Sequence, residues 1–168
     1  GFPTRTLDDT DRGYENFSAS AQLRGDLGPA EVALRHWRAE GTSEYSDSFL
    51  TPVDQDFENS TSVLSVAWPL GEAARAEIRG SHFEDRTGQN QSPDYLRTVR
   101  DSVDAQLDWR VSKAHTLGAG AMYSSERASS ESYGEVMRAD TGSLTLFVQD
   151  RIDSGRHRAQ LAPGYTDH

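Results

Sequence analysis

Residues 98–111 read TVRDSVDAQLDWRV, and their side chains alternate between apolar and polar with a period of two. The apolar members are Val99, Val103, Ala105, Leu107, Trp109 and Val111. Asp101 is the one exception on the apolar side. A helix would distribute these side chains around its axis, whereas a strand places them on two opposite faces. The stretch therefore predicts a β-strand with one apolar face and one polar face.

Seven further segments repeat this alternation over shorter spans. Their apolar members are Phe17, Ala19, Ala21 and Leu23; Ala30, Val32 and Leu34; Leu64, Val66 and Trp68; Ala74, Ala76 and Ile78; Leu117, Ala119, Ala121 and Tyr123; Leu144, Leu146 and Val148; and Ala159, Leu161 and Tyr165. We therefore expect an all-β chain of about eight strands, without a convincing helix.

The connections between these segments alternate between short and long. Turn residues mark short connections at 26–29, 69–72, 112–114 and 153–155. Long polar stretches, which we interpret as loops, lie near 41–58, 84–96 and 125–140. Antiparallel strands with short turns at one end and long loops at the other form an up-and-down meander. The sequence thus predicts a β-barrel or a fragment of one.

Composition and motifs exclude several classes of function. The 168 residues include no Cys, which excludes a disulfide scaffold, a Cys-zinc site and a thiol enzyme. A formal net charge of −10 argues against a nucleic-acid surface, which needs clustered Lys and Arg. The low mean hydropathy excludes a transmembrane helix but not a transmembrane β-barrel. The chain has no Gly-x-Ser-x-Gly elbow, phosphate loop or dinucleotide fingerprint, so we do not expect an enzyme.

The size of the apolar side chains indicates which way the apolar face points. A small closed barrel needs bulky residues to fill its interior, whereas this face is rich in Ala and the opposite face carries charges. We therefore favour a barrel with its polar face inside and its apolar face toward lipid. Trp68 and Trp109 precede tight turns, and Tyr123 lies near the other end of its strand, as in an interfacial aromatic belt.

Several short matches in order along the chain resemble a known family. They lie at residues 11–16 (DRGYEN), 41–54 (GTSEYSDSFLTPVD), 97–109, 118–121 (GAGA) and 138–144 (RADTGSL). Together they resemble the middle of the barrel of TonB-dependent vitamin B12 (cobalamin) receptors of Gram-negative outer membranes. The resemblance implies an outer-membrane transporter that takes up cobalamin, with outer-membrane lipid around the barrel.

The resemblance also implies that residues 1–168 are a single barrel segment. The family's plug domain, TonB box and C-terminal closing strand do not correspond to any part of the sequence, so TonB is expected to act only through a plug outside these residues. Pro163 within the last strand fits a sheet edge, because proline removes a ladder donor. The alternatives are a free-standing eight-stranded barrel that serves as a structural or small-molecule-binding module, and a hydrolase on a β scaffold.

The segment 39–74 is strongly acidic and indicates a cation site. It contains Glu40, Glu44, Asp47, Asp54, Asp56, Glu58 and Glu72, and no Lys or Arg. A hard divalent cation such as Ca²⁺ would relieve the repulsion among these carboxylates. In the resembled receptors, extracellular loops bind calcium and thereby order the substrate site. The matching positions are Tyr45, Asp47 and Asp54, with Asp56 as a neighbour; a solvated acidic loop is the alternative.

Aromatic residues in the long polar stretches are candidate ligand contacts. Phe49, Tyr95 and Tyr133 lie where the loops of the resembled receptors would meet a bulky corrinoid. Tyr45 joins them by its position in the matching loop. Local anchoring of the loops is the alternative role for all of these side chains.

Overall fold

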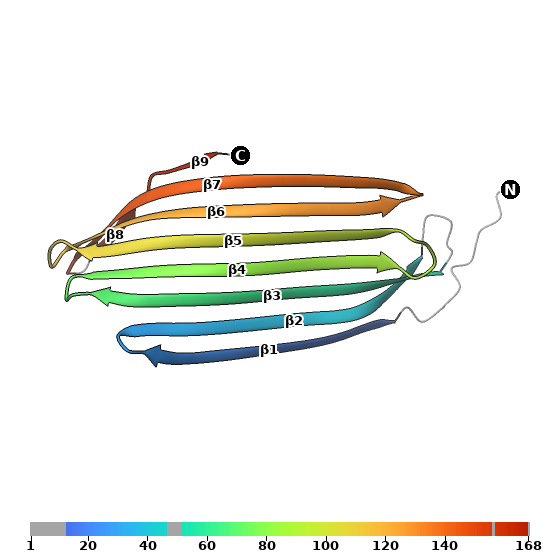
Figure 1. Ribbon diagram of the computed structural model, residues 1–168, viewed down its shortest axis with the longest axis horizontal. Coiled ribbons are helices and arrows are strands. Elements are labelled where there is room, and N and C mark those ends of the chain that lie inside the picture. The colour runs from blue at the N-terminus through green and yellow to red at the C-terminus, as the bar shows by residue number, and fades with distance from the viewer. Residues whose placement is uncertain (1–12, 47–51, 156, 168) are drawn as a thin grey trace.

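The computed structural model describes residues 13–46, 52–155 and 157–167, which form one antiparallel sheet of nine strands (Figure 1). The strands are β1 (Tyr14–Leu27), β2 (Ala30–Ser46), β3 (Pro52–Leu70), β4 (Ala74–Gln89), β5 (Tyr95–Arg110), β6 (His115–Ser132), β7 (Glu135–Ser154), β8 (His157–Leu161) and β9 (Gly164–Asp167). From β1 to β8 each strand pairs with the next one in sequence. The predicted all-β up-and-down meander is therefore confirmed. Helices long and apolar enough to cross a membrane are absent from the described residues.

The strands β8 and β9 are two parts of one edge strand. Both pair with β7, and the break between them falls at Ala162 and Pro163. Proline cannot donate a ladder hydrogen bond, but the carbonyl of Pro163 still accepts one from the amide of Val148 at 3.1 Å. The predicted edge position of Pro163 is confirmed.

The predicted tight turns all lie at one end of the sheet (Figure 1). Gly28 and Gly71 sit in two of these turns with φ of 62° and 75°. This left-handed region is strained for residues that carry a Cβ, so glycine is the natural choice at both positions.

The polar stretches interpreted as long loops are largely strand in the structure. The described connections at this end are only residues 90–94 and 133–134. The alternation of apolar and polar residues ends here because both faces are polar, but the hydrogen-bonded pairing of the strands continues. Cross-strand polar pairs support them: the hydroxyl of Thr42 donates to Asp56 at 2.6 Å, and Arg97 donates to Glu84 at 2.7 Å. The hairpins therefore continue well beyond their apolar part.

Strand register places the apolar side chains in rows on one face, which we call the apolar face. One row across the sheet joins Leu23, Leu34, Leu64, Gly80, Val103, Tyr123 and Leu144. Along β5 the apolar rows run from Trp109 to Val103, and we call this region the apolar band. Its aromatic side chains Trp109 and Tyr123 lie toward its two ends. The opposite side of the sheet is called the polar face.

The apolar band is exposed. Val103 is 56% exposed and Leu107 43%, and Leu146 and Leu161 are 46% and 63% exposed. Among the described residues, the buried hydrophobic side chains are only Ala39, Val53, Ala67 and Val99. A soluble protein rarely shows an apolar surface this continuous to water. The sheet is thus built to place its apolar face against hydrocarbon rather than around a core of its own.

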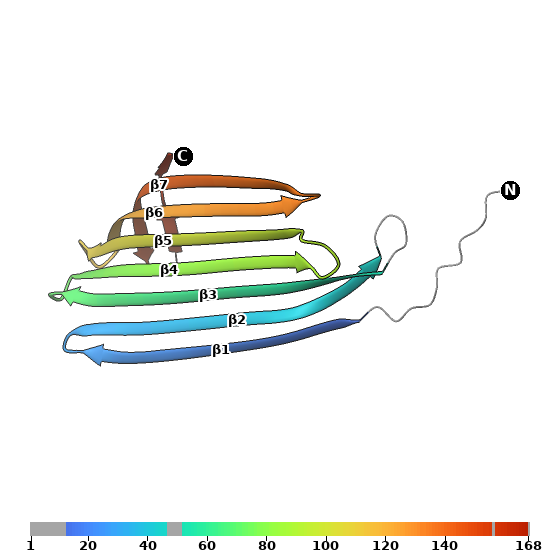
Figure 2. The same cartoon turned by 45° about the vertical axis from the view of Figure 1, so that its right-hand side comes forward.

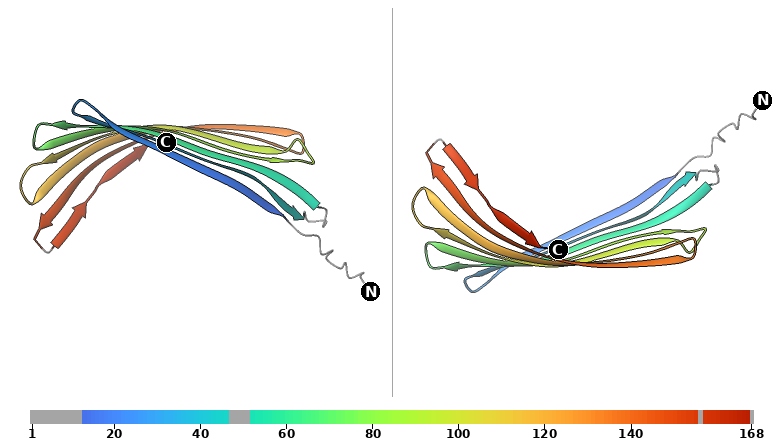
Figure 3. Two further views of the ribbon diagram at one scale, coloured as in Figure 1. Left: turned by 90° about the horizontal axis from the view of Figure 1, so that it is seen from below. Right: turned by 90° about the horizontal axis from the view of Figure 1, so that it is seen from above.

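The sheet is curved, as Figures 2 and 3 show. Side chains on the concave side of a curved sheet crowd one another, whereas those on the convex side spread apart. On β5 the polar-face residues Asp104 and Gln106 are half-buried, and the apolar-face residues Val103 and Leu107 are exposed. This alternation identifies the polar face as the concave one, as expected for the inner wall of a large barrel.

The described strands do not close into a barrel. β1 pairs with β2 alone, and the far side of the sheet ends at β8 and β9 beside β7. Both edges therefore present backbone groups that a further strand could satisfy. Within the described ranges, the chain forms an open, curved β-sheet.

Candidate functional site

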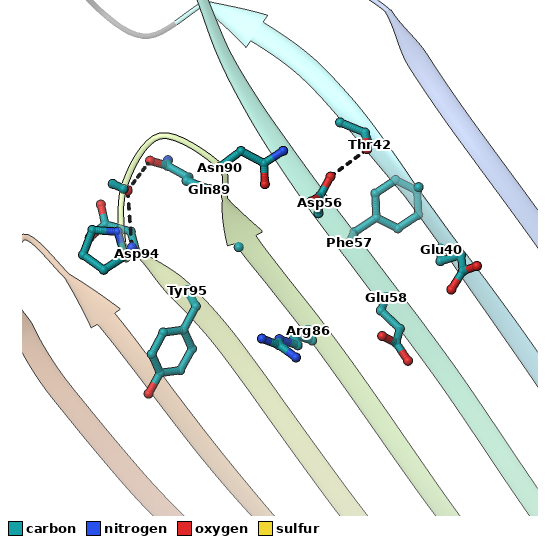
Figure 4. Close-up of a pocket in the computed structure, with 14 residues that line it drawn as sticks. Glu40, Thr42, Asp56, Phe57, Glu58, Arg86, Gln89, Asn90, Asp94 and Tyr95 are labelled. Carbon is teal, nitrogen blue, oxygen red and sulfur yellow. Dashed lines mark hydrogen bonds between the residues drawn. The ribbon is translucent and has the colours of Figure 1, made fainter.

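A hollow of about 570 Å³ lies at the end of the sheet opposite the tight turns, beyond the apolar band (Figure 4). The ends of β2, β3 and β4 and the connection to β5 surround it. Its lining includes Thr42, Asp56, Phe57, Arg86, Asp94 and Tyr95. This volume lies within the range of small-molecule sites, of roughly 300–1,000 Å³.

Phe57 forms an apolar part of the lining. Its ring stacks on Tyr14 of β1, with centroids 5.9 Å apart and an angle of 11° between the planes. Gly41 makes room for this arrangement, because a Cβ there would meet the carbonyl oxygen of Glu15 at 1.9 Å and the Phe57 ring at 2.8 Å. The close packing of β1, β2 and β3 at this end thus depends on a glycine at position 41.

The connection from β4 to β5 is ordered by its own side chains. Ser92 donates to Gln89 Oε1 at 3.1 Å and accepts from the amide of Asp94 at 3.3 Å, while the amide of Gln89 donates to the carbonyl of Asp94 at 3.0 Å. Two of these bonds are visible in Figure 4. They fix the start of β5 and hold Tyr95 at the hollow.

Hydrogen bonds also tie the tips of neighbouring hairpins together. The amide of Asn90 donates to the carbonyl of Asp54 at 2.9 Å, and the amide of Asp54 donates to Gln91 Oε1 at 3.0 Å. On the other side, the amide of Tyr133 donates to Asp94 Oδ1 at 2.9 Å. The connection at 90–94 therefore links the start of β3 to the β6–β7 turn.

The charges around the hollow are mixed. Arg38 bridges Glu40 at 2.6 Å and Glu58 at 3.2 Å, so it neutralises part of the acidic segment from within β2. Arg86 on β4 lies in register with Glu58, and it makes no ion pair or side-chain hydrogen bond with any described residue. The site thus offers carboxylates and one uncommitted guanidinium to a ligand.

The structure separates the predicted aromatic contacts. Tyr95 lines the hollow, and Tyr133 lies in the β6–β7 turn with its side chain in solvent. Tyr45 is on the polar face, where its hydroxyl accepts a hydrogen bond from Gln89 at 2.8 Å. Phe49 lies outside the described residues. Tyr95 and Tyr133 therefore share one end of the sheet, and Tyr45 lies on the opposite face from Tyr95.

The predicted calcium ligands are only partly placed. Asp54 and Asp56 lie two residues apart on one face of β3, and Asp56 lines the hollow. Asp47 lies outside the described residues. Within the ranges that the structure describes, no three His, Cys, Asp or Glu side chains are grouped to hold a metal ion. The calcium site stays a prediction that depends on Asp47.

Sequence reasoning missed Thr42, Phe57, Arg86 and Asp94 as parts of this site. The acidic segment contains no Lys or Arg, but the register of β3 and β4 places Arg86 opposite Glu58. Phe57 falls on the polar face, where the alternation of apolar residues gives no reason to expect a functional aromatic side chain. Only the pairing of the strands brings these side chains to one place.

Comparison with known proteins shows the class of fold. No protein-family model matches the sequence, and no curated protein does. The solved structures of an outer-membrane protein of Vibrio cholerae do match. The structure of OmpT with loop L8 deleted has a TM-score of 0.62 at 16% identity, and the match covers 90% of this chain and 48% of OmpT. The structure of outer-membrane expressed OmpT has a TM-score of 0.61 at 15% identity, and that match covers 91% of this chain and 46% of OmpT.

A receptor structure matches as well. The siderophore receptor PiuA from Acinetobacter baumannii has a TM-score of 0.60 at 9% identity and covers 95% of this chain and 39% of that one. The chain therefore has the fold of an outer-membrane β-barrel wall and spans less than half the length of these neighbours. They support the outer-membrane localisation expected from the sequence.

Proposed function

We propose that this chain is part of the wall of a TonB-dependent outer-membrane transporter, with its hairpin tips facing the exterior to capture a ligand. The observation that carries the proposal is the combination of an exposed apolar band with aromatic residues toward both ends and a ligand-sized hollow beyond one end of the band. The likeness in fold to the siderophore receptor PiuA supports it.

Transport would need parts that the sheet does not supply. The unpaired edge of β1 and the edge at β8 and β9 call for further strands to close a barrel. In the proposed mechanism, TonB acts on a plug domain that fills the closed barrel, and the polar face lines the space around that plug. The alternative of a free-standing eight-stranded barrel has less support, because the described strands leave the sheet open.

We propose cobalamin as the ligand, on the basis of the sequence resemblance. Tyr133 supports a role in binding. It is 96% exposed, and its backbone φ of 53° is one that residues other than glycine rarely adopt. Strained, exposed residues are often retained for function. Tyr95 at the hollow offers a second aromatic surface for a large planar ligand.

Calcium is proposed to order this end of the sheet through Asp47, Asp54 and Asp56. Two carboxylates on one face of β3 supply too few oxygens for Ca²⁺, which takes six to eight, so Asp47 and backbone carbonyls would complete the site. Binding would hold the β2–β3 connection against the 90–94 connection, which already contacts Asp54.

Ligand binding tests the proposed function. Titration of the purified protein in detergent with cyanocobalamin, followed by tryptophan quenching, should give saturable binding. We expect Tyr95→Ala with Tyr133→Ala to weaken it at least tenfold. Tyr165→Ala, on the apolar face of β9, is the matched control and should leave it unchanged. Absence of saturable binding, or equal loss in both variants, would refute cobalamin capture at this site.

Calorimetry tests the calcium proposal separately. Ca²⁺ should bind the protein, and the double variant Asp54→Asn, Asp56→Asn should lose at least tenfold in affinity. The control Asp26→Asn, Glu72→Gln removes the same charge near the tight turns. Unchanged Ca²⁺ affinity in the first variant would remove the proposal and leave the acidic segment as a solvated surface.

A further inference from the structure

Four arginines lie together on the apolar-face side of the sheet, beyond the band. Arg86 is on β4, Arg97 on β5, Arg127 on β6 and Arg138 on β7. Register places Arg86 directly opposite Arg97, and Ser129 lies between Arg97 and Arg138 in the same row. We call these four residues the arginine cluster. It stands out in a chain whose formal net charge is −10.

The cluster is only partly neutralised. Arg97 donates to Glu84 at 2.7 Å, and Arg127 contacts Asp101 at 3.1 Å. Arg86 and Arg138 make no ion pair or side-chain hydrogen bond with the residues that the structure describes. Like charges directly opposite each other on neighbouring strands destabilise a sheet. The pairing of Arg86 with Arg97 therefore has an energetic cost that an anionic ligand would offset.

Two adjacent hollows open between these side chains. One, of about 360 Å³, is lined by Arg97, Arg127 and Arg138 and also by the carboxylates of Glu84 and Asp140. The other, of about 480 Å³, is lined by Arg86, Arg97 and Tyr95 together with Glu84. Arg97 belongs to both hollows. Each is large enough for a phosphate group, and the guanidinium fork binds phosphate oxygens in pairs.

The cluster lies just outside the level of the lipid headgroups, within reach of long Arg side chains. Arg127 follows Tyr123, the aromatic residue at the edge of the band, by four residues on the same face of β6. This corresponds to about 14 Å along the strand, and the row of Arg86, Arg97 and Arg138 lies two residues farther, at about 20 Å. A strand tilt of about 45° reduces these distances to heights of about 10 Å and 14 Å. Headgroup regions occupy roughly the first 5–8 Å outside the hydrocarbon, and long Arg side chains reach toward them.

We propose that the arginine cluster binds the phosphates of a diphosphorylated membrane lipid whose acyl chains lie on the apolar band. Charge complementarity and the continuity of the cluster with the band argue for this occupant. Arg86 and Arg138, which form no ion pair among the described residues, each bind a phosphate, and the paired Arg97 and Arg127 support them from between. The proposal rests on the orientation given under the proposed function, with the apolar face toward lipid.

Native mass spectrometry of the purified protein in a non-ionic detergent tests this, with diphosphoryl lipid A as the probe. We expect Arg86→Gln with Arg138→Gln to weaken lipid binding about tenfold or more. The control Arg24→Gln, Arg35→Gln removes two arginines from the polar face and should retain binding within twofold. Phosphatidylcholine should bind at least tenfold more weakly than the probe to the unmodified protein.

Equal loss in both variants, or no loss in the first, would overturn the proposal. Inorganic phosphate that displaces the lipid at micromolar concentration would also overturn it, because the site would then recognise free phosphate. Lipid binding and cyanocobalamin binding measured on Arg138→Gln alone separate this inference from the proposed function, because Arg138 does not line the candidate site. Retained cobalamin binding with unchanged lipid binding would contradict the lipid site alone.

Discussion

The ring of Phe147 on β7 lies over Gly120 on β6, so close that a Cβ at position 120 would come within 2.4 Å of it. The carbonyl oxygen of Ala105 would be 2.8 Å from the same Cβ on the other side. Gly118 is similarly covered, by Gln149 and Asp108. The glycines of β6 thus let large side chains lie across the crowded concave face.

The substitution Gly120→Ala should therefore destabilise the folded protein. Overpacking of this kind costs about 1–3 kcal/mol, because the Phe147 ring and the β5 backbone must both shift. Urea unfolding in detergent measures the change. Gly80→Ala on the apolar face is the control, since nothing lies within 4 Å of a Cβ there, and it should be neutral or slightly stabilising. Equal effects of the two substitutions would show that the concave face is not crowded.

A charge on alternate residues of β5 should act differently on the two faces. Leu107→Arg places a guanidinium within the apolar band and should reduce the unfolding free energy in lipid vesicles by about 2 kcal/mol. Gln106→Arg, one residue away on the polar face, should cost less, because the side chain at 106 already lies beside the carboxylate of Asp108. If Gln106→Arg were the more damaging change, the assignment of the faces would be wrong.

Tyr133 should be replaceable without loss of stability. Tyr133 and Gly134 both have positive φ, which is typical of a type I′ turn that prefers Asn-Gly. Tyr133→Asn should therefore stabilise the β6–β7 hairpin by about 0.5–1 kcal/mol. Thermal unfolding measures this change. A destabilised variant would mean that the Tyr133 side chain supports the fold, which would weaken its proposed role as a ligand contact.

The strands and their faces could be read from the sequence because burial on one face imposes a period of two. Residues 98–110 lie in β5 and have the predicted alternation, whereas Val111 follows the strand. Trp37 falls on the polar face with Arg35, as its parity indicates. Pro163 marks the edge for a local reason, its missing N–H. These features depend on short-range geometry, which the sequence carries directly.

The hairpin tips could not be read in this way. Between 84 and 96 and between 125 and 140 both faces are polar, so periodicity vanishes although the ladder continues. The hollow gathers Thr42 and Arg86 from strands whose register no local pattern specifies. The sequence places Tyr45 in the same kind of polar stretch as Tyr95, but β2 continues through Tyr45 and presents it on the other face.

Site-directed spin labelling along β5 in lipid vesicles tests the central claim, that the apolar face meets lipid. The 168 residues include no Cys, so a single Cys substitution at each of residues 103–108 attaches one spin label at a known position. We predict that accessibility to oxygen, which dissolves in hydrocarbon, is high at Val103, Ala105 and Leu107. Accessibility to a water-soluble nickel complex should be high at the residues between them. The same accessibility at all six positions, or the reversed alternation, would contradict the account.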